Sequence, residues 1–281
     1  MKKLVERINE IGGVDFITIG GMGEPTLDKK LPQKLEFLKK NLKKNTLIQL
    51  HTNGSSSIEL LRKLLPNVTT FSVSVNAALS KTHEYLTETK SYSQILKNLS
   101  FLAKSKSKHN YKIRLTLVKS KFLQKGEIKL FQRQFNRLAD DIVLHDDKNW
   151  GSWKHRVIKY QRPCTVIWKT LSVNWDGTVR LCTEDFNRKY SLGDIKKHSI
   201  KEIFNSRLIV KARREHRKGL FGNSIKICKE CSKTETNIFW AKLPIKHYKH
   251  KNFFDIILMN ALKFKKMFNN YKMNISTEVH F

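Results

Sequence analysis

A strand that runs into three glycines and a glutamate is the feature that most constrains this chain. Residues 16–19 (Phe-Ile-Thr-Ile) have the apolar, β-branched character of a buried strand, and Gly20, Gly21, Gly23 and Glu24 follow it. Glycines at a strand end allow a sharp turn and let a ligand approach the main chain. Carbonyl oxygens beside a carboxylate suit an ammonium group, which has only donors. The stretch therefore predicts a primary-amine pocket at the edge of a parallel sheet. The alternative is an ordinary turn with a solvated glutamate.

The segment that follows alternates between predicted strands and predicted helices. Strands are expected at 16–19, 46–54 (ending in a polar, glycine-containing turn), 68–76, 111–118 and 141–146, and helices at 4–11, 31–42, 58–65, 92–103 and 128–138. Such alternation indicates a parallel sheet with crossover helices. We therefore expect an α/β fold, an incomplete (partial TIM-like) parallel β/α barrel with a small α+β cysteine-rich C-terminal domain. The expected domains are residues 1–150, residues 160–235 and a basic amphipathic tail at 240–281.

Polar residues follow the ends of the predicted strands. Asn53 lies in the turn that ends the second strand, Ser74 and Asn76 end the third, and Asp146 ends the fifth. Because the carboxyl ends of parallel strands meet at one edge of a sheet, we expect these residues to lie along one rim with Glu24. This convergence favours a ligand pocket over a set of unrelated solvated turns.

The chain is strongly basic, with a formal charge of +31 over 281 residues. A charge of this size favours contact with a polyanion, such as nucleic acid, an anionic membrane surface or a phosphorylated substrate. The lysines are spread over the whole chain without a compact arginine-rich arm, so nucleic acid is not the favoured partner. In the tail, apolar residues sit among lysines, which leaves peripheral membrane contact open beside docking on the protein body.

Cysteine usage and the N-terminal residues bear on the compartment. Met1-Lys2-Lys3 leads into a short amphipathic segment rather than a long apolar core, so we expect no signal peptide. No run of about 18 apolar residues occurs. Cysteines without an export signal indicate a reducing, cytoplasmic compartment, in which they serve as metal ligands or reactive thiols rather than disulfides.

A predicted hairpin brings the first two cysteines together. Residues 171–182 alternate around Asp176-Gly177, the strongest short hairpin signal. With a two-residue turn, Cys182 is expected opposite Leu171. Cys164 lies seven residues before Leu171, so its thiol is expected near Cys182 at the open end of the hairpin.

The four cysteines are a complete ligand set for zinc or for an iron–sulfur cluster. Cys228 and Cys231 form a Cys-x2-Cys pair, whereas a zinc ribbon uses two such pairs. A cubane cluster is larger than one ion and accepts ligands from dispersed elements, so the spacing of Cys164 and Cys182 favours a [4Fe–4S] cluster. Zinc and unligated core thiols remain the alternatives.

These motifs together resemble the radical S-adenosylmethionine (SAM) enzymes that carry a SPASM or Twitch extension. Residues 20–27 (Gly-Gly-Met-Gly-Glu-Pro-Thr-Leu) resemble the Gly-Gly-Glu-Pro motif that binds the amino group of SAM, and residues 51–54 (His-Thr-Asn-Gly) resemble the Thr-Asn-Gly rim motif. Residues 72–76 resemble a SAM-holding strand end, with Asn76 in place of the usual acid. The resemblance implies SAM contacts at Gly20, Gly21, Gly23, Glu24, Asn53, Ser74 and Asn76.

The cysteine pattern is similar to the SPASM signature. Cys164, Gly177 and Cys182 match its opening, and Cys228 with Cys231 matches the next part. No cysteine follows Cys231, as in the shortened Twitch form. The resemblance therefore implies that all four thiolates hold one auxiliary [4Fe–4S] cluster.

One family feature is missing. The family carries a Cys-x3-Cys-x2-Cys loop ahead of the glycine motif, and no residue before Gly20 is a cysteine. That loop holds the cluster that cleaves SAM to a 5′-deoxyadenosyl radical, which then takes a hydrogen atom from the substrate. We expect a fragment or a diverged copy that lacks the first strand and is inactive alone.

The resemblance leaves catalytic residues and substrate unassigned. Peptides, carbohydrates and small molecules are the substrate classes it implies, and a reductant protein is a further expected partner. Trp150 and Trp153 lie between the modules, where packing of the linker is favoured over substrate contact. The competing hypothesis is a non-catalytic iron–sulfur or zinc module that binds a partner or a polyanion.

Overall fold

The computed structural model of the chain describes residues 1–147, 161–229 and 231. These residues form two compact units. The first contains residues 16–147, and the second contains residues 2–15 together with the described residues from 161 onward. The predicted tail at 240–281 lies outside the described residues, as do Trp150 and Trp153.

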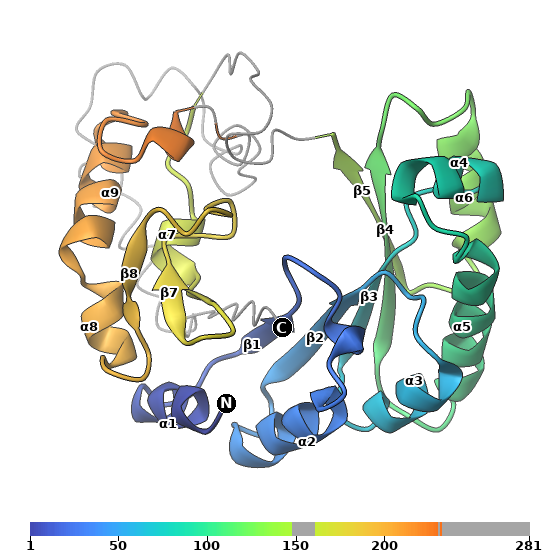
Figure 1. Cartoon of the computed structure of the whole chain (residues 1–281), viewed down its shortest axis with the longest axis horizontal. Coiled ribbons are helices and arrows are strands. Elements are labelled where there is room, and N and C mark those ends of the chain that lie inside the picture. Colours follow the sequence, from blue (N-terminus) through green and yellow to red (C-terminus); the bar gives the residue numbers. More distant parts are fainter. Residues whose placement is uncertain (148–160, 230, 232–281) are drawn as a thin grey trace, which may run out of the picture. The chain divides into compact units, whose positions relative to one another are not determined.

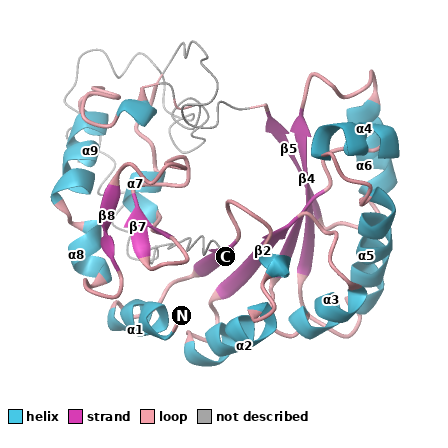
Figure 2. Cartoon of the chain, viewed as in Figure 1, coloured by secondary structure: helices cyan, strands magenta, loops and turns pink. Residues whose placement is uncertain are grey.

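The first unit is built on one parallel sheet. Its strands are β1 (Phe16–Ile19), β2 (Leu47–Thr52), β3 (Thr70–Ser74), β4 (Lys112–Lys119) and β5 (Asp141–Asp146). They lie side by side in chain order, and every neighbouring pair is parallel (Figures 1 and 2). This confirms the predicted α/β fold with an incomplete, TIM-like β/α barrel.

Helices connect these strands and lie on one side of the sheet (Figure 1). They are α2 (Leu31–Asn41), α3 (Ile58–Leu64), α4 (Ser80–Thr87), α5 (Tyr92–Ser105) and α6 (Glu127–Phe135). Four of the five were predicted, and α4 was missed. The residues that α4 buries are Thr82 and His83, so its sequence lacks the apolar periodicity from which a helix is predicted.

Parallel pairing gives this sheet one apolar face and one polar face. Residues that pair across neighbouring strands point to the same side of the sheet. The apolar face holds Ile17, Ile19, Ile48, Leu50, Phe71, Val73, Ile113, Leu115 and Leu117, all buried. Gly54 lies against both Val73 and Ile95 of α5, so the helices cover this face. The opposite side, hereafter the polar face, holds Thr18, Gln49, His51, Ser72, Ser74, Arg114 and Thr116.

The second unit contains a small antiparallel sheet, which agrees with the predicted α+β module. Its strands are β6 (Ser172–Val173), β7 (Thr178–Arg180) and β8 (Ser191–Asp194), and its helices are α1 (Lys2–Glu10), α7 (Val166–Lys169), α8 (Ile200–Phe204) and α9 (Arg207–Arg217). The Ser199 side chain and Glu202 form a capping box at the start of α8.

The hairpin forms, but its predicted register is wrong. Val173 pairs with Val179 and Ser172 with Arg180, which places Leu171 level with Leu181 and not with Cys182. Gly177 has a φ of 92°, the left-handed conformation that closes a three-residue turn. The Asp-Gly pair therefore predicted the position of the turn correctly but its length incorrectly.

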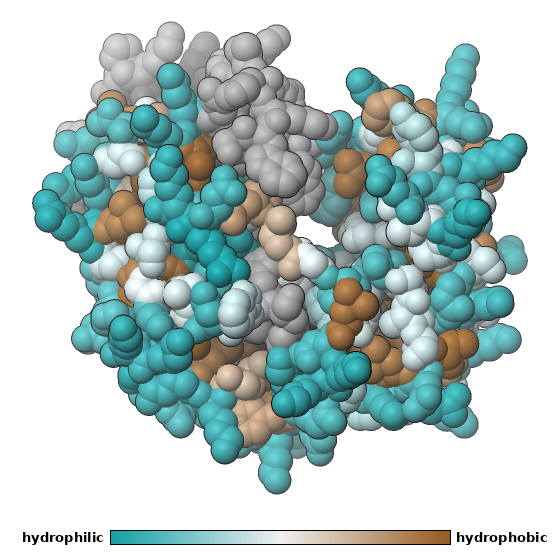
Figure 3. Space-filling model, viewed as in Figure 1, coloured by the Kyte–Doolittle hydropathy of each residue, from teal (hydrophilic) through white to brown (hydrophobic). Residues whose placement is uncertain are grey.

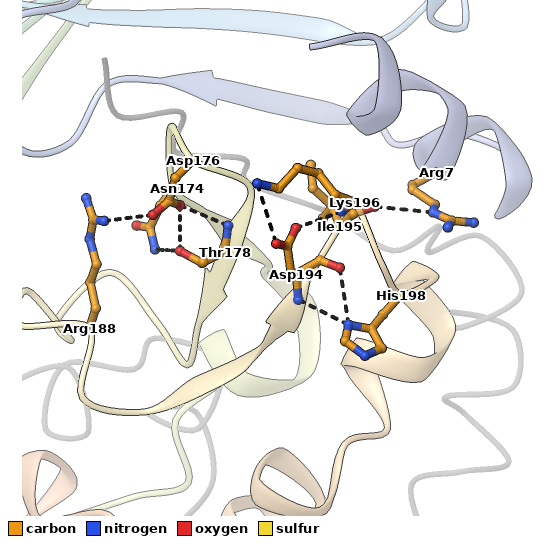
Figure 4. Close-up of polar contacts among 9 residues, drawn as sticks. All are labelled: Arg7, Asn174, Asp176, Thr178, Arg188, Asp194, Ile195, Lys196 and His198. Carbon is orange, nitrogen blue, oxygen red and sulfur yellow. Dashed lines mark hydrogen bonds and ion pairs between the residues drawn. The ribbon is translucent and has the colours of Figure 1, made fainter.

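Side-chain oxygens hold this longer turn together (Figure 4). Asp176 Oδ1 accepts hydrogen bonds from the Thr178 amide at 2.9 Å and from its hydroxyl at 2.6 Å. Asn174 Nδ2 donates to the same hydroxyl at 2.9 Å, and Arg188 pairs with the other carboxylate oxygen of Asp176 at 3.2 Å. These contacts stabilise the extra turn residue.

Helix α1 belongs with the second unit by its contacts. Arg7 Nε donates a hydrogen bond to the Ile195 carbonyl, just after β8, at 3.4 Å (Figure 4). Arg7 is also fixed by an ion pair to Glu10 at 2.8 Å. The sequence pattern had assigned this helix to the segment 1–150, whereas its packing groups it with the cysteine-bearing residues.

The visible surface is largely hydrophilic, with apolar side chains scattered over it (Figure 3). Within the described ranges, the most exposed large apolar residues are Leu27, Trp175 and Tyr85. Among the described residues, no helix combines the length and apolar character needed to cross a bilayer.

Two glycines provide a matched test of the turn after β2. Gly54 has a φ of 77°, and a Cβ there would lie 2.6 Å from Val73 Cγ1. Gly126 has a φ of 83° but open space around it. We expect Gly126→Ala to lower the free energy of unfolding by about 1–2 kcal/mol through backbone strain alone. Gly54→Ala should lose about 1–3 kcal/mol more through overpacking. Urea denaturation measures both, and equal losses would contradict the close approach at Gly54.

Candidate functional site

Glu24 joins the turn after β1 to the end of β2. Its Oε1 accepts hydrogen bonds from the Thr26 amide at 3.1 Å, the Thr26 hydroxyl at 2.7 Å and the Thr52 hydroxyl at 2.7 Å. Its Oε2 accepts from the Asn53 amide at 2.6 Å. The carboxylate thus caps the short helix η1 (Pro25–Leu27) and fixes two neighbouring strand ends. Because a carboxylate oxygen has two lone pairs, Oε2 keeps capacity for a further donor.

The glycines around Glu24 have two different roles. Gly20 is buried with a φ of 152°, and a Cβ there would lie 2.7 Å from the His51 Cβ, so β1 approaches β2 only because this side chain is absent. Gly21 and Gly23 are exposed and also have positive φ values. Their main-chain atoms are therefore accessible to a ligand at this turn.

The end of β3 continues the same edge of the sheet. Ser74 Oγ accepts a hydrogen bond from the Thr116 hydroxyl at 3.1 Å. The Val75 and Asn76 amides both lie within hydrogen-bonding distance of the Thr116 carbonyl, at 3.2 and 3.3 Å. Asn76 has a φ of 63°, a left-handed conformation that asparagine tolerates better than most residues. The structure thus places Ser74 and Asn76 at the strand end next to that of Asn53.

A buried glutamate that the sequence reasoning missed holds the loop after Asn76. Glu127, at the start of α6, is only 2% exposed. Its Oε1 accepts from the Ala78 amide at 2.9 Å and the Leu79 amide at 3.1 Å, and its Oε2 accepts from the Thr82 hydroxyl at 3.0 Å and the Gln124 amide at 2.9 Å. Glu127 is therefore a positioning residue for the strand-end rim, which we define as Gly20–Glu24, Asn53, Ser74 and Asn76.

His51 lies beneath this rim on the polar face. Its Nε2 contacts Gln49 Nε2. Burial, together with the smaller effects of the positive charges of Arg114 and His145, lowers the pKa of His51 to about 4. His51 is therefore a neutral polar group near pH 7, able to donate or accept a hydrogen bond. In the sequence, polar residues at alternate positions of β2 and β4 indicate this polar face.

The second unit brings all four cysteines to one pocket. Cys164 precedes α7, Cys182 follows β7, Cys228 ends the short helix η3 (Lys226–Cys228), and Cys231 follows it. All four line a single pocket, whose other lining residues are Val166, Ile167, Glu184, His216 and Ile227. The predicted juxtaposition of Cys164 with Cys182 is therefore present, although the hairpin register behind it differs.

The electrostatics of this pocket call for a cation. Burial raises the pKa of the Cys228 thiol, and the neighbouring Cys182, Cys231 and Cys164 raise it further. Four thiolates together in an apolar pocket are stable only against strong positive charge. Among the residues that the structure describes, no three acidic, histidine or cysteine side chains converge closely enough to hold a single ion. Four cysteines around one pocket are a complete ligand set for an iron–sulfur cluster or for zinc.

His216 is a pocket residue that the sequence gave no reason to select. It lies on α9, 2% exposed, and its Nδ1 accepts a hydrogen bond from the Cys164 amide at 3.2 Å. Burial lowers its pKa to about 4, against a smaller opposing effect of Glu215. It sits among basic residues of an amphipathic helix, so only the tertiary fold reveals its position.

Two family models match the sequence. Residues 1–122 match the radical SAM superfamily, and residues 164–232 match SPASM, described as an iron-sulfur cluster-binding domain. The first match covers the strand-end rim, and the second begins at Cys164 and takes in all four cysteines. No curated protein matches the sequence.

Solved structures share the fold at low identity. The chain resembles anSMEcpe with bound AdoMet at 15% identity and a TM-score of 0.60, over 96% of this chain and 90% of that one. It resembles BtrN in complex with AdoMet and 2-DOIA at 20% identity and a TM-score of 0.51, over 82% and 77%. It resembles Streptococcus suis SuiB bound to S-adenosylmethionine at 12% identity and a TM-score of 0.55, over 83% and 62%.

The neutral state of the half-buried His51 predicts a pH dependence of stability. Because its pKa falls from 6.5 to about 4 on folding, the unfolded chain takes up the proton first as the pH drops. Stability should therefore decline between pH 6.5 and pH 4, with a contribution from His51 of up to about 3 kcal/mol.

The variant His51→Gln removes this contribution and should flatten the decline in thermal midpoint over that range. His109→Gln, which changes a half-buried histidine before β4 and away from the polar face, is the matched control. An unchanged slope in His51→Gln would contradict the lowered pKa of His51.

Proposed function

Because the chain belongs to the radical SAM superfamily and carries a SPASM iron–sulfur cluster-binding domain, we propose that its cysteine pocket holds one auxiliary [4Fe–4S] cluster and that its strand-end rim binds SAM. The observation that carries the first part is the gathering of Cys164, Cys182, Cys228 and Cys231 around one pocket. The cysteine spacing supports iron over zinc, since a zinc ribbon uses two Cys-x2-Cys pairs and this chain has one.

The rim has the chemistry that SAM requires. Glu24 Oε2 would accept from the ammonium of the methionyl group, next to the exposed main chain of Gly21 and Gly23. Glu24 also accepts a hydrogen bond from the Asn53 amide, so the ligand-binding carboxylate is held in a fixed position relative to the end of β2. Ser74 and Asn76 extend the same edge toward the remainder of the ligand. SAM bound at such a rim supplies the 5′-deoxyadenosyl group that superfamily members use to abstract hydrogen.

The printed sequence does not supply the ligands of the SAM-cleaving cluster. All four of its cysteines lie at position 164 or later, and no Cys-x3-Cys-x2-Cys motif occurs in the 281 residues. We therefore derive no cleavage step from these residues. The proposal is that this chain by itself binds SAM without cleaving it, and that an oxidoreductase activity needs a cluster loop from outside these residues.

The auxiliary cluster defines the expected reaction class. When bound, it supplies a one-electron acceptor or a ligation point for substrate beside the radical site. The solved anSMEcpe and BtrN structures contain a peptide and 2-DOIA, respectively. A peptide, a carbohydrate or another small molecule is accordingly the proposed substrate class, with a reductant protein as electron donor and the cytoplasm as compartment.

The charge of +31 favours a second candidate function. A chain that keeps the auxiliary cluster but not the SAM-cleaving cysteines is also suited to a non-catalytic role, in which the iron–sulfur unit binds a partner or a polyanion. SAM affinity distinguishes the two functions, because only the first needs an intact rim.

Anaerobic reconstitution with iron and sulfide tests the cluster. We expect about four irons per chain, as in a Cys₄ cubane. Cys228→Ser should lose most of this iron, because it removes a thiolate from the set. Thr165→Ser, beside Cys164 but not lining the pocket, should retain it. One zinc per chain and no iron would overturn the cluster assignment, and clearly more than four irons would overturn the single-cluster count.

Isothermal titration with SAM tests the rim. We expect Glu24→Gln to weaken SAM binding at least tenfold, because it removes a charge-assisted hydrogen bond to the ammonium group. Glu36→Gln, which changes an exposed carboxylate on α2, should bind as the unmodified protein does. Circular dichroism separates loss of fold from loss of affinity. No SAM binding by the folded, unmodified protein would favour the non-catalytic function.

A further inference from the structure

The pocket contains a buried nitrogen with no hydrogen-bond partner. His216 lines the pocket beside the four cysteines and is 2% exposed. Its Nδ1 is engaged, since it accepts from the Cys164 amide at 3.2 Å. Its Nε2 is buried and has no partner within the part of the chain that the structure describes. A buried polar atom left unpaired is costly, and in native proteins it points to a missing ligand, ion or water.

The engaged nitrogen fixes the tautomer of the ring. A neutral imidazole has one acceptor nitrogen and one N–H donor. Because Nδ1 accepts from a main-chain amide, which is itself only a donor, the ring proton is on Nε2. Nε2–H is therefore a hydrogen-bond donor and not a metal-binding lone pair.

Aromatic neighbours hold the ring in this orientation. The ring of Phe221 meets that of His216 edge-on with centroids 5.0 Å apart, and that of Trp168 does so at 6.3 Å. Apart from Glu184, the side chains that share the pocket are apolar or are cysteines. Sulfur is thus the principal acceptor that the pocket offers to the unpaired donor.

We propose that His216 Nε2–H donates a hydrogen bond to a sulfur of the auxiliary cluster, either a cysteine thiolate or a sulfide, and thereby raises the reduction potential of that cluster. The inference rests on the proposed cluster at the four cysteines. Reduction adds one electron, whose negative charge is shared by the sulfurs. A donor aimed at sulfur stabilises the reduced form more than the oxidised form.

Two replacements separate the two ring nitrogens. In His216→Asn, the side-chain oxygen takes the position of Nδ1 and still accepts from the Cys164 amide. The shorter side chain has no donor at the position of Nε2. In His216→Gln, the longer side chain places an amide N–H at the position of Nε2 and so restores the donor. His83→Asn, at a histidine of α4 that is also 2% exposed but belongs to the first unit, is the matched control.

Redox titration of the reconstituted protein, followed by its visible absorption and by electron paramagnetic resonance, measures the effect. At a fixed potential, His216→Asn should show about a tenfold lower ratio of reduced to oxidised cluster than the unmodified protein, equivalent to about 59 mV for one electron. His216→Gln should recover most of this difference, and His83→Asn should show none. Equal midpoint potentials in His216→Asn and the unmodified protein, at equal iron content, would overturn the proposal.

A measurement on the unmodified protein tests the hydrogen bond without depending on a variant that retains its cluster. With ¹⁵N-histidine labelling, electron–nuclear double resonance on the reduced cluster should detect a ¹⁵N coupling with an exchangeable proton beside it. The absence of any histidine coupling in iron-loaded protein would overturn the hydrogen bond and leave the cluster intact. Failure of the unmodified protein to load iron would instead reject the cluster itself.

Discussion

Polar groups that are removed from water need hydrogen-bond partners, and this requirement determines the structure of the loops and pockets in both units. In the first unit, the carboxylates of Glu24 and Glu127 each accept four hydrogen bonds from the turns around them. All eight donors are main-chain amides or threonine hydroxyls, and half of them belong to loops between strands and helices. The two carboxylates thus replace the hydrogen bonds that a regular strand or helix would have provided, and they fix the loops on which a ligand pocket depends.

The same requirement gives the second unit a different character. Its pocket contains a histidine nitrogen for which the described protein atoms provide no hydrogen-bond partner. Structural carboxylates such as Glu127 have all their partners within the protein, whereas Nε2 of His216 needs a group bound in the cysteine pocket. The distinction separates groups that organise the protein from groups that organise a cofactor.

The sequence predicted what depends on local pattern. Hydrophobic periodicity and glycine turns were enough for all five parallel strands, and Ser199 with Glu202 was enough for the capping box. The hairpin register was wrong because Asp176-Gly177 suits both two-residue and three-residue turns, and only the pairing of Val173 with Val179 decides between them. Glu127 and His216 were missed because the contacts that define their roles, from Ala78, Leu79 and Thr82 to Glu127 and from Cys164 to His216, span 45 or more residues, and no local pattern encodes such contacts.

The large positive charge and His216 would act on a cluster over different ranges. Helix α9 carries Lys211, Arg213, Arg214 and Arg217 along with His216, and Arg213 is held in place by the carbonyls of Ile167 and Phe204. A field of exposed charges also favours a reduced, more negative cluster, but salt screens it beyond about 10 Å at 0.1 M ionic strength. A buried hydrogen bond to sulfur is not screened in this way. The contribution of His216 should therefore persist at high salt, where that of the surface lysines and arginines fades.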